Sequence, residues 1–440
     1  MDWQKSARSL NVSIAAMAGT GIATDAETVS AFIIDIEPNL SVASRLPVNS
    51  MLSSVEVRSA ETLGGGDHLL DVSGVPATLG GNKVKHIVCV IDGTWQTATM
   101  RKTDDNFSNA YNLNWMLENR TDDGSDQVVF YFSGLGTDQS SQPYTAGAFA
   151  RGLDHQIAEA YINIASNYRL SPAGETPDKI YLFGFSRGSV AARAIAGMIS
   201  HCGLLQPSRM NHYQEIYEAF ISGEPLSGAL KKFVYRDVAI EFVGVFDTVF
   251  GDYSMSRKFN ELEFPNLDLP KAVKVGVHFL AIDERRKFFA PMLWESCAKD
   301  QVLEQIWMPG VHSDIGGVYP NRYLGMRALR SMIDRILKHT DLRFNKVLLA
   351  SLDTMIEAPT FLPHINNELV MPWGFLPKIT RHASQTAKHQ YLHPVIRDID
   401  RLPVAIRRRI QDYDIRSFLA GAEIPYFDDW YDMPNWPRAD

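Results

Sequence analysis

Short apolar runs recur along the chain from residue 85 onward, separated by longer stretches of helical composition. Each run has the length of a strand and is rich in β-branched and aromatic side chains. The alternation of single strands with helical connections predicts an α/β fold, with a mainly parallel central sheet flanked by helices. The predicted strands are His86–Ile91, Gln127–Phe132, Lys179–Phe183, Ile240–Phe246, Val273–Ile282 and Glu304–Met308.

The pattern changes near residues 80 and 320, which divides the chain into three parts. Residues 1–80 are rich in Ala, Ser, Val and Gly and form an N-terminal extension to which we assign no role. Residues 81–320 contain the predicted strands and form the main domain. Residues 321–440 form a C-terminal accessory region with helical stretches such as Gly325–His339 and an aromatic end around Trp430.

The composition is that of a globular protein with one large core. Of the 440 residues, 45% are hydrophobic and 21% are charged. The formal net charge of -8 offers no general attraction to nucleic acid, so we expect no nucleic-acid partner. The three cysteines, Cys89, Cys202 and Cys297, have no Cys-x-x-Cys spacing and look like reduced core residues.

The start of the chain lacks the features of an export signal. No basic stretch is followed by an apolar segment there, and no apolar run approaches the length of a membrane-spanning helix. We therefore expect a soluble protein in the cytoplasm of the cell that makes it, without a signal peptide or a transmembrane segment.

The pentapeptide Gly184-Phe185-Ser186-Arg187-Gly188 joins a predicted strand to a small-residue helix. A sharp strand-to-helix turn that raises a serine hydroxyl above a sheet tolerates almost no side chain two residues before or after that serine. The motif in this context predicts a nucleophile elbow with Ser186 as the nucleophile. The alternative is an ordinary turn that happens to contain a serine.

A nucleophilic serine needs a base and a carboxylate, which follow it in the chain in the order acid, then histidine. His312, in a glycine-bounded loop after the last predicted strand, is favoured as the base over the mid-strand His278, for which a packed core role is expected. Asp247 ends a strand and ranks first as the acid. Asp283 ranks second because two arginines follow it, and Asp314 lies too near His312 to face its ring and is expected to shape the loop.

The same chemistry needs donors for an oxyanion, of which the residue after the nucleophile, here Arg187, commonly supplies one. The turn after the first predicted strand offers the N–H of Gly93 or Thr94 as the second. Asp92 in this turn is equally expected to cap the next helix. Asp-Gly-Thr turns also occur at the sites of metal-dependent phosphatases, but no second carboxylate cluster follows, so we expect neither a metal nor a cofactor.

Six segments, in this order, give the chain a resemblance to a known family: Cys89–Trp95, Gly134–Thr137, Gly184–Gly188, Gly244–Val249, Ala281–Arg286 and Pro309–Tyr319. Over roughly residues 85 to 320 the chain resembles the α/β-hydrolase catalytic domain of bacterial type VI secretion phospholipase effectors. That domain family also has many uncharacterised bacterial and fungal members. The resemblance implies a triad of Ser186, Asp247 and His312, and so favours Asp247 over Asp283.

The resemblance also implies a function. Characterised members hydrolyse ester bonds of membrane phospholipids, so we expect a serine esterase that forms an acyl-enzyme. The implied partners are the phospholipid and its membrane surface, an immunity protein and a component of the secretion apparatus, and the implied destination is the periplasm of a target cell. The alternative is an intracellular carboxylesterase that acts on a soluble or lipid ester in metabolism or defence.

Overall fold

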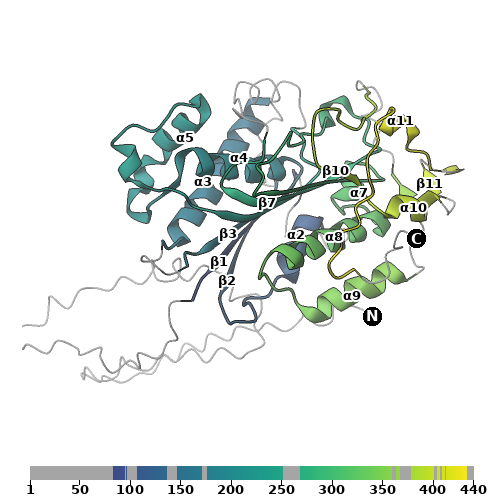
Figure 1. Ribbon diagram of the computed structural model, residues 1–440, viewed down its shortest axis with the longest axis horizontal. Coiled ribbons are helices and arrows are strands. Elements are labelled where there is room, and N and C mark those ends of the chain that lie inside the picture. The colour runs from purple at the N-terminus through teal and green to yellow at the C-terminus, as the bar shows by residue number, and fades with distance from the viewer. Residues whose placement is uncertain are drawn as a thin grey trace, which may run out of the picture. The chain divides into compact units, whose positions relative to one another are not determined.

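A central parallel sheet organises the protein (Figure 1). The computed structural model describes residues 83–94, 96, 107–135, 146–170, 176–250, 268–358, 363–366, 378–400, 404–406, 409–411 and 413–433. The N-terminal extension predicted for residues 1–80 lies outside these residues.

Seven strands form this sheet, and every neighbouring pair in it is parallel. In spatial order they are β10 (Gln390–Leu392), β8 (Val302–Met308), β7 (Val273–Ala281), β6 (Ile240–Phe246), β3 (Lys179–Phe185), β1 (His86–Ile91) and β2 (Gln127–Phe132).

The central strands are buried on both faces, which is why they are continuous apolar runs. In β1, Ile87, Cys89 and Ile91 point into one hydrophobic core, whereas Val88 and Val90 point into the other. The period of two along a strand thus fills both cores with side chains from a single segment.

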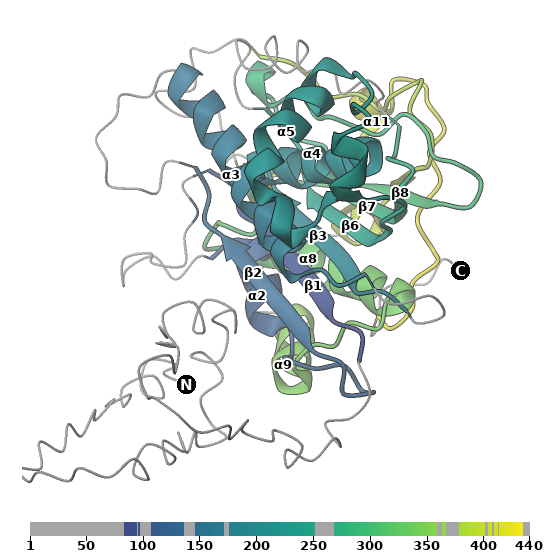
Figure 2. The same cartoon turned by 90° about the vertical axis from the view of Figure 1, so that its left-hand side faces the viewer.

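Helices cover both faces of the sheet, as Figures 1 and 2 show. One face is covered by α3 (Ala146–Asn167), α4 (Arg187–Cys202) and α5 (Tyr213–Ser222). The other is covered by α2 (Asn109–Met116), α8 (Tyr323–His339) and α9 (Lys346–Glu357). This layered arrangement is α/β-hydrolase-like.

Smaller elements connect and flank these layers. Two short strands pair in an antiparallel sheet, and three others form a further small sheet. These short elements are β4 (Leu204–Leu205), η5 (Pro207–His212), η6 (Leu230–Lys232), β5 (Val234–Tyr235), η7 (Lys287–Phe289), α7 (His312–Ile315), β9 (His364–Ile365), α10 (Val395–Asp400), β11 (Val404–Ile406), β12 (Arg409–Gln411) and α11 (Arg416–Leu419).

The strand order reverses between β1 and β3. The chain passes from β1 outward to β2, and then returns to place β3 on the opposite side of β1. In open parallel sheets, ligands bind beyond the carboxyl ends of the strands at such a switch point. The turns that follow β1 and β3 both lie at this edge.

The six strands predicted from the sequence are confirmed, with ends that differ by at most two residues. The seventh, β10, was not predicted because its three residues are too short to give a periodic signal. It comes from the region expected to be accessory, yet it pairs with β8 of the main sheet. The division of the chain at residues 80 and 320 stays a prediction.

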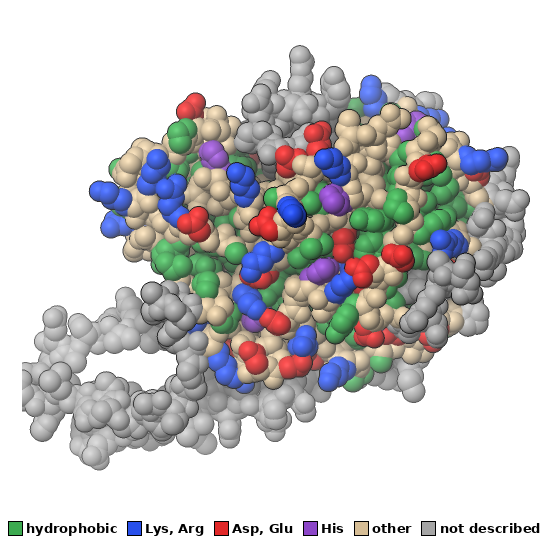
Figure 3. Space-filling view, in the orientation of Figure 1, with side chains coloured by type: hydrophobic (Ala, Val, Ile, Leu, Met, Phe, Trp, Pro, Cys, Tyr) green, Lys and Arg blue, Asp and Glu red, His purple; other side chains and the backbone are tan. Residues whose placement is uncertain are grey.

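The surface and the cysteines refine the expectations from composition. On the face shown in Figure 3, acidic and basic side chains are interspersed over the described residues. Cys89 and Cys202 are buried and unpaired as expected, whereas Cys297 is partly exposed. Among the helices described, none combines the length and apolarity that crossing a membrane requires.

Candidate active site

Ser186 occupies the turn between β3 and α4, and its backbone has a conformation that residues other than glycine rarely adopt, with φ 59° and ψ -121°. Its flanking glycines make the turn possible. A Cβ atom on Gly184 would lie 2.6 Å from the carbonyl of Gly188, and one on Gly188 would lie 2.1 Å from the carbonyl oxygen of Ile91. The backbone strain at Ser186 is therefore held by close packing of the turn against the end of β1.

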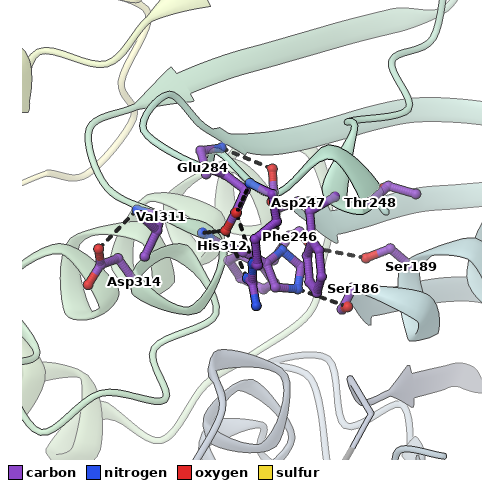
Figure 4. A network of polar contacts seen from close by, with 12 residues as sticks. Ser186, Ser189, Phe246, Asp247, Thr248, Glu284, Val311, His312 and Asp314 are labelled. Atoms are coloured by element: carbon purple, nitrogen blue, oxygen red, sulfur yellow. Dashed lines mark hydrogen bonds and ion pairs between the residues drawn. The ribbon is translucent and has the colours of Figure 1, made fainter. Parts of the chain in front are cut away.

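Ser186, His312 and Asp247 form a continuous chain of hydrogen bonds (Figure 4). His312 Nε2 lies 2.9 Å from Ser186 Oγ, and His312 Nδ1 lies 2.7 Å from Asp247 Oδ2. An ionised carboxylate only accepts hydrogen bonds, so Nδ1 carries the proton and Nε2 can accept from the serine hydroxyl. All three side chains are buried. The arrangement is able to move a proton away from Ser186.

Asp247 is fixed by its backbone as well as by its side chain. It follows β6 with a positive φ of 40°, and its N–H donates to Phe279 O at 2.7 Å. The N–H of Ala281 donates to its Oδ1 at 3.0 Å. The next residue, Thr248, donates its N–H to Nε2 of His278 at 3.0 Å. His278 is thus a buried neighbour that anchors the turn, and burial lowers its pKa well below the usual value.

His312 begins the short helix α7 after β8. Its ring stacks on Phe185 at 4.8 Å between centroids, and the ring of Phe289 meets it edge-on at 5.0 Å. Its N–H donates to Glu284 Oε2 at 3.3 Å. Asp314 accepts from the N–H of Val311 at 2.9 Å, so it shapes the loop as predicted. The ring of His312 is therefore confined on two sides.

Arg381 is the second side chain that binds the Asp247 carboxylate. Its two terminal nitrogens lie 2.6 Å from Oδ1 and 3.0 Å from Oδ2, and both side chains are fully buried. Burial alone would raise the pKa of Asp247, but Arg381 and His312 outweigh burial and lower it. Asp247 is consequently ionised at neutral pH.

Asp283, the second-choice acid, contacts other groups. Its Oδ2 accepts from the N–H of Gly310 at 2.7 Å and from the Tyr413 hydroxyl at 2.9 Å. The carboxylate at His312 Nδ1 is that of Asp247.

The turn after β1 lies against the elbow, as expected for a source of oxyanion donors. A Cβ atom on Gly188 would approach the carbonyl oxygen of Asp92 to 2.6 Å. The N–H of Gly93, however, donates to the Asp92 carboxylate at 2.6 Å. The hydroxyl of Thr94 is buried and has no hydrogen-bond partner among the residues that the structure describes. The Gly93 donor is thus engaged within its own turn, which leaves Thr94 as the candidate from the turn after β1.

Asp92 is a buried carboxyl group at this turn. Its Oδ2 accepts from the hydroxyls of Ser108 at 2.5 Å and Tyr131 at 2.7 Å. Burial raises its pKa to about 6, although these hydrogen bonds and that from Gly93 oppose the rise. Asp92 therefore fixes the turn rather than capping α2, whose first turn is capped by the Ser108 hydroxyl.

Three residues that support the site were not identified from the sequence. Glu284, which accepts from the N–H of His312 and pairs with Arg286, lies in the segment Ala281–Arg286 of the family resemblance, and that was the signal available for it. Asn109 donates from Nδ2 to Ile315 O at 2.9 Å and to Gly325 O at 2.8 Å, which ties α7 to α8. Arg381 has no local pattern around it, and only the fold brings it to Asp247. Within the part of the chain described, no group of three or more His, Cys, Asp or Glu side chains is arranged to hold a metal ion.

Comparison with known proteins identifies a family whose sequence model matches this chain. Residues 85–335 match the model of the family described as "T6SS, Phospholipase effector Tle1-like, catalytic domain". An uncharacterized protein of Saccharomyces cerevisiae is 31% identical over an alignment of 241 positions, and the match covers 47% of this chain and 33% of that relative. This chain therefore spans about a third of the length of that curated relative.

Two solved structures share low similarity with the chain. One is an uncharacterized protein from Pseudomonas aeruginosa, with 18% identity, a TM-score of 0.37, and coverage of 60% of this chain and 47% of that one. The other is the Tle1 effector bound to the VgrG spike of the type VI secretion system. It has 21% identity, a TM-score of 0.30, and coverage of 53% of this chain and 51% of that one.

Proposed function

The chain belongs to the family of type VI secretion phospholipase effectors with a Tle1-like catalytic domain, and from this premise we propose that it is a serine-dependent lipolytic hydrolase. Its substrates are the carboxylic ester bonds of membrane phospholipids, and its catalytic residues are Ser186, His312 and Asp247. The observation that supports this most is the pair of hydrogen bonds that His312 makes, 2.9 Å to Ser186 and 2.7 Å to Asp247.

The proposed reaction is acyl transfer in two steps. His312 Nε2 takes the proton of Ser186 as Oγ attacks the ester carbonyl, and the imidazolium that forms is stabilised by Asp247. His312 then gives this proton to the leaving alcohol, which leaves the acyl group on Oγ. In the second step His312 takes a proton from water, the hydroxide attacks the acyl carbonyl, and the proton returns to Ser186 as the fatty acid departs.

The oxyanion of each tetrahedral intermediate needs donors at this turn. Arg187, the first residue of α4, supplies one N–H in the proposal. Of the two candidates after β1, Thr94 is favoured over Gly93 because the N–H of Gly93 donates to Asp92. Loss of one such donor costs about 10²–10³ in kcat in serine hydrolases.

An antibacterial effector role follows from the family. In this role the protein is delivered into the periplasm of a competing bacterium, where it degrades membrane lipids. A component of the secretion apparatus and an immunity protein in the producing cell are the partners that the role requires. Export to the periplasm of a test bacterium is expected to be toxic, whereas cytoplasmic expression is expected to be tolerated.

The intracellular carboxylesterase is the second candidate. The similarity to a yeast protein favours it, because a similar segment in a eukaryote points to a use apart from bacterial secretion. Toxicity in neither compartment, together with hydrolysis of soluble esters only, would support this candidate over the effector.

The substrate class is tested with a panel of phospholipid vesicles and soluble carboxylic esters, with products identified by mass spectrometry. Wild type is expected to release free fatty acid from phospholipid. The positions cleaved then distinguish A1, A2 and lysophospholipase activities. Ser186→Ala serves as the control for a contaminating lipase, and release of fatty acid by this variant at the wild-type rate would refute the proposal.

A further inference from the structure

Arg381 reaches the candidate site from a part of the chain that the family match does not cover. The match ends at residue 335, 46 positions before Arg381. Backbone contacts hold the segment around Arg381 against the chain that follows β7. Ile379 donates its N–H to Arg285 O at 2.9 Å, and Lys378 forms an antiparallel β-bridge with Arg286. The arginine is thereby presented to Asp247 from outside the sheet.

The guanidinium makes four hydrogen bonds, two of them to Asp247. One terminal nitrogen donates to Asp247 Oδ1 at 2.6 Å and to Ala281 O at 2.7 Å. The other donates to Asp247 Oδ2 at 3.0 Å and to Phe289 O at 2.5 Å. A forked pair of this kind fixes the plane of a carboxylate as well as its charge. Oδ2 is the same atom that accepts from His312.

The charges around this carboxylate come from several elements. Burial acts to raise the pKa of Asp247, and the positive charge of Arg381 is the largest influence that lowers it. Glu284 is itself paired with Arg286. Among the described residues, Arg381 and His312 on α7 act on Asp247 directly. His278 on β7 interacts with Asp247, Arg381 and Arg193 on α4. Glu284, after β7, interacts with Arg286 and Arg381.

We propose that Arg381 is a positioning residue that holds the Asp247 carboxylate in the orientation and charge state that His312 requires. The inference rests on the proposed hydrolase function, in which Asp247 acts through His312. It makes the segment after residue 335 part of the working site. A purely structural role is the competing explanation, because the contacts with Ala281 O and Phe289 O also brace the chain.

The pH dependence of kcat/KM separates these two roles. In Arg381→Met the anion loses its largest source of stabilisation while burial persists. The hydrogen-bonded pair of Asp247 and His312 then binds a proton at a higher pH than in wild type, so the acidic limb of the kcat/KM profile moves to higher pH. Arg381→Lys keeps the positive charge but loses the paired hydrogen bonds to the two carboxylate oxygens. The acidic limb of its pH profile therefore stays near that of wild type, while kcat falls. The exposed Arg416, which pairs with Asp414 at 2.7 Å, supplies the control Arg416→Met, with an unchanged profile.

A spectroscopic readout makes the test independent of ester hydrolysis. In protein with ¹⁵N-labelled histidine, the proton shared by His312 Nδ1 and Asp247 is followed by its downfield NMR signal, assigned by its loss in His312→Gln. The signal is expected to change at a higher pH in Arg381→Met than in wild type. That shift would support the inference even if no ester were hydrolysed, which would count against the proposed function alone.

The proposal is overturned if a folded Arg381→Met shows the wild-type acidic limb and the wild-type NMR titration with only lowered thermal stability. If Arg381→Met fails to fold, Arg381→Lys decides: a wild-type kcat in that variant would exclude a positioning role, and a reduced kcat with an unmoved limb would support it.

Discussion

The imidazole of His312 lies 2.9 Å from the hydroxyl of Ser186, although 126 positions separate the two residues in the chain. Ser186 follows β3 and His312 follows β8, and two strands, β6 and β7, lie between these in the sheet. The loop after β8 must therefore cross the carboxyl ends of β6 and β7. Asp247, at the end of β6, meets the ring of His312 on this path. The parallel order of the strands thus brings three distant segments to one edge.

Asp247→Asn is predicted to lower kcat by about 10³–10⁴-fold, because an amide can offer its N–H groups to His312 Nδ1 and so favour the wrong tautomer. Asp283→Asn is predicted to stay within about 30-fold of wild type, since it alters two hydrogen bonds worth about 1 kcal/mol each, to Gly310 and Tyr413. Steady-state kinetics on a phospholipid substrate provide the comparison. The reverse ranking of the two variants would show that the acid is misassigned.

Gly188→Ala is predicted to destabilise the fold by about 1–3 kcal/mol, because the new Cβ would lie 2.1 Å from the carbonyl oxygen of Ile91. Gly228→Ala is the matched control, since its Cβ meets nothing within 4 Å, and it is expected to change stability by less than about 1 kcal/mol. Urea denaturation measures both. Equal stability of the two variants would mean that the turn at Ser186 relaxes more easily than its packing implies.

Asp92→Asn is predicted to change stability in a pH-dependent way. The pKa of Asp92 is raised by burial from 3.8 to about 6, so the folded protein binds a proton more tightly than the unfolded chain. Wild-type stability from this group therefore falls as pH rises between these two values and is level above them. Asparagine does not titrate, so the free energy of unfolding of the variant relative to wild type should increase from pH 4 to pH 6.

The size of this increase is on the order of 3 kcal/mol, from about two pKa units. The amide makes different hydrogen bonds with Ser108 and Tyr131, which adds an offset to the stability at every pH without changing the slope. Urea denaturation of both proteins at several pH values measures the slope. A difference in stability that is independent of pH would show that Asp92 titrates normally.

Much of the fold could be predicted because each central strand is a local signal. A run such as Phe242–Phe246 fills two cores at once, so its apolar character is visible without knowledge of its neighbours. The elbow at Ser186 was equally local, since its glycines are required by contacts within a few residues and with β1. Asp247 and His312 could be placed near it because each follows a predicted strand and because the acid and the histidine follow the serine in the chain. Their catalytic roles stay predictions.

The remainder depended on contacts between distant segments. Arg381 approaches Asp247 across 134 positions, and a lone arginine in a segment without periodicity gives no sign of a buried partner. The engagement of the Gly93 N–H by Asp92 depends on how one turn closes, which residue type alone does not determine. The three residues of β10 likewise gain their role from pairing with β8.

Mass spectrometry of the protein quenched during turnover of a phospholipid is the most direct test of Ser186 as the residue that carries the acyl group. Trypsin cleaves after Lys179 and Arg187, so Ser186 is released in the peptide Ile180–Arg187. We predict an acyl group of the substrate on this peptide at Ser186, and its absence in His312→Gln and in Ser186→Ala, neither of which should hydrolyse the lipid. Continued hydrolysis by Ser186→Ala, or an acyl group on a different residue, would contradict it.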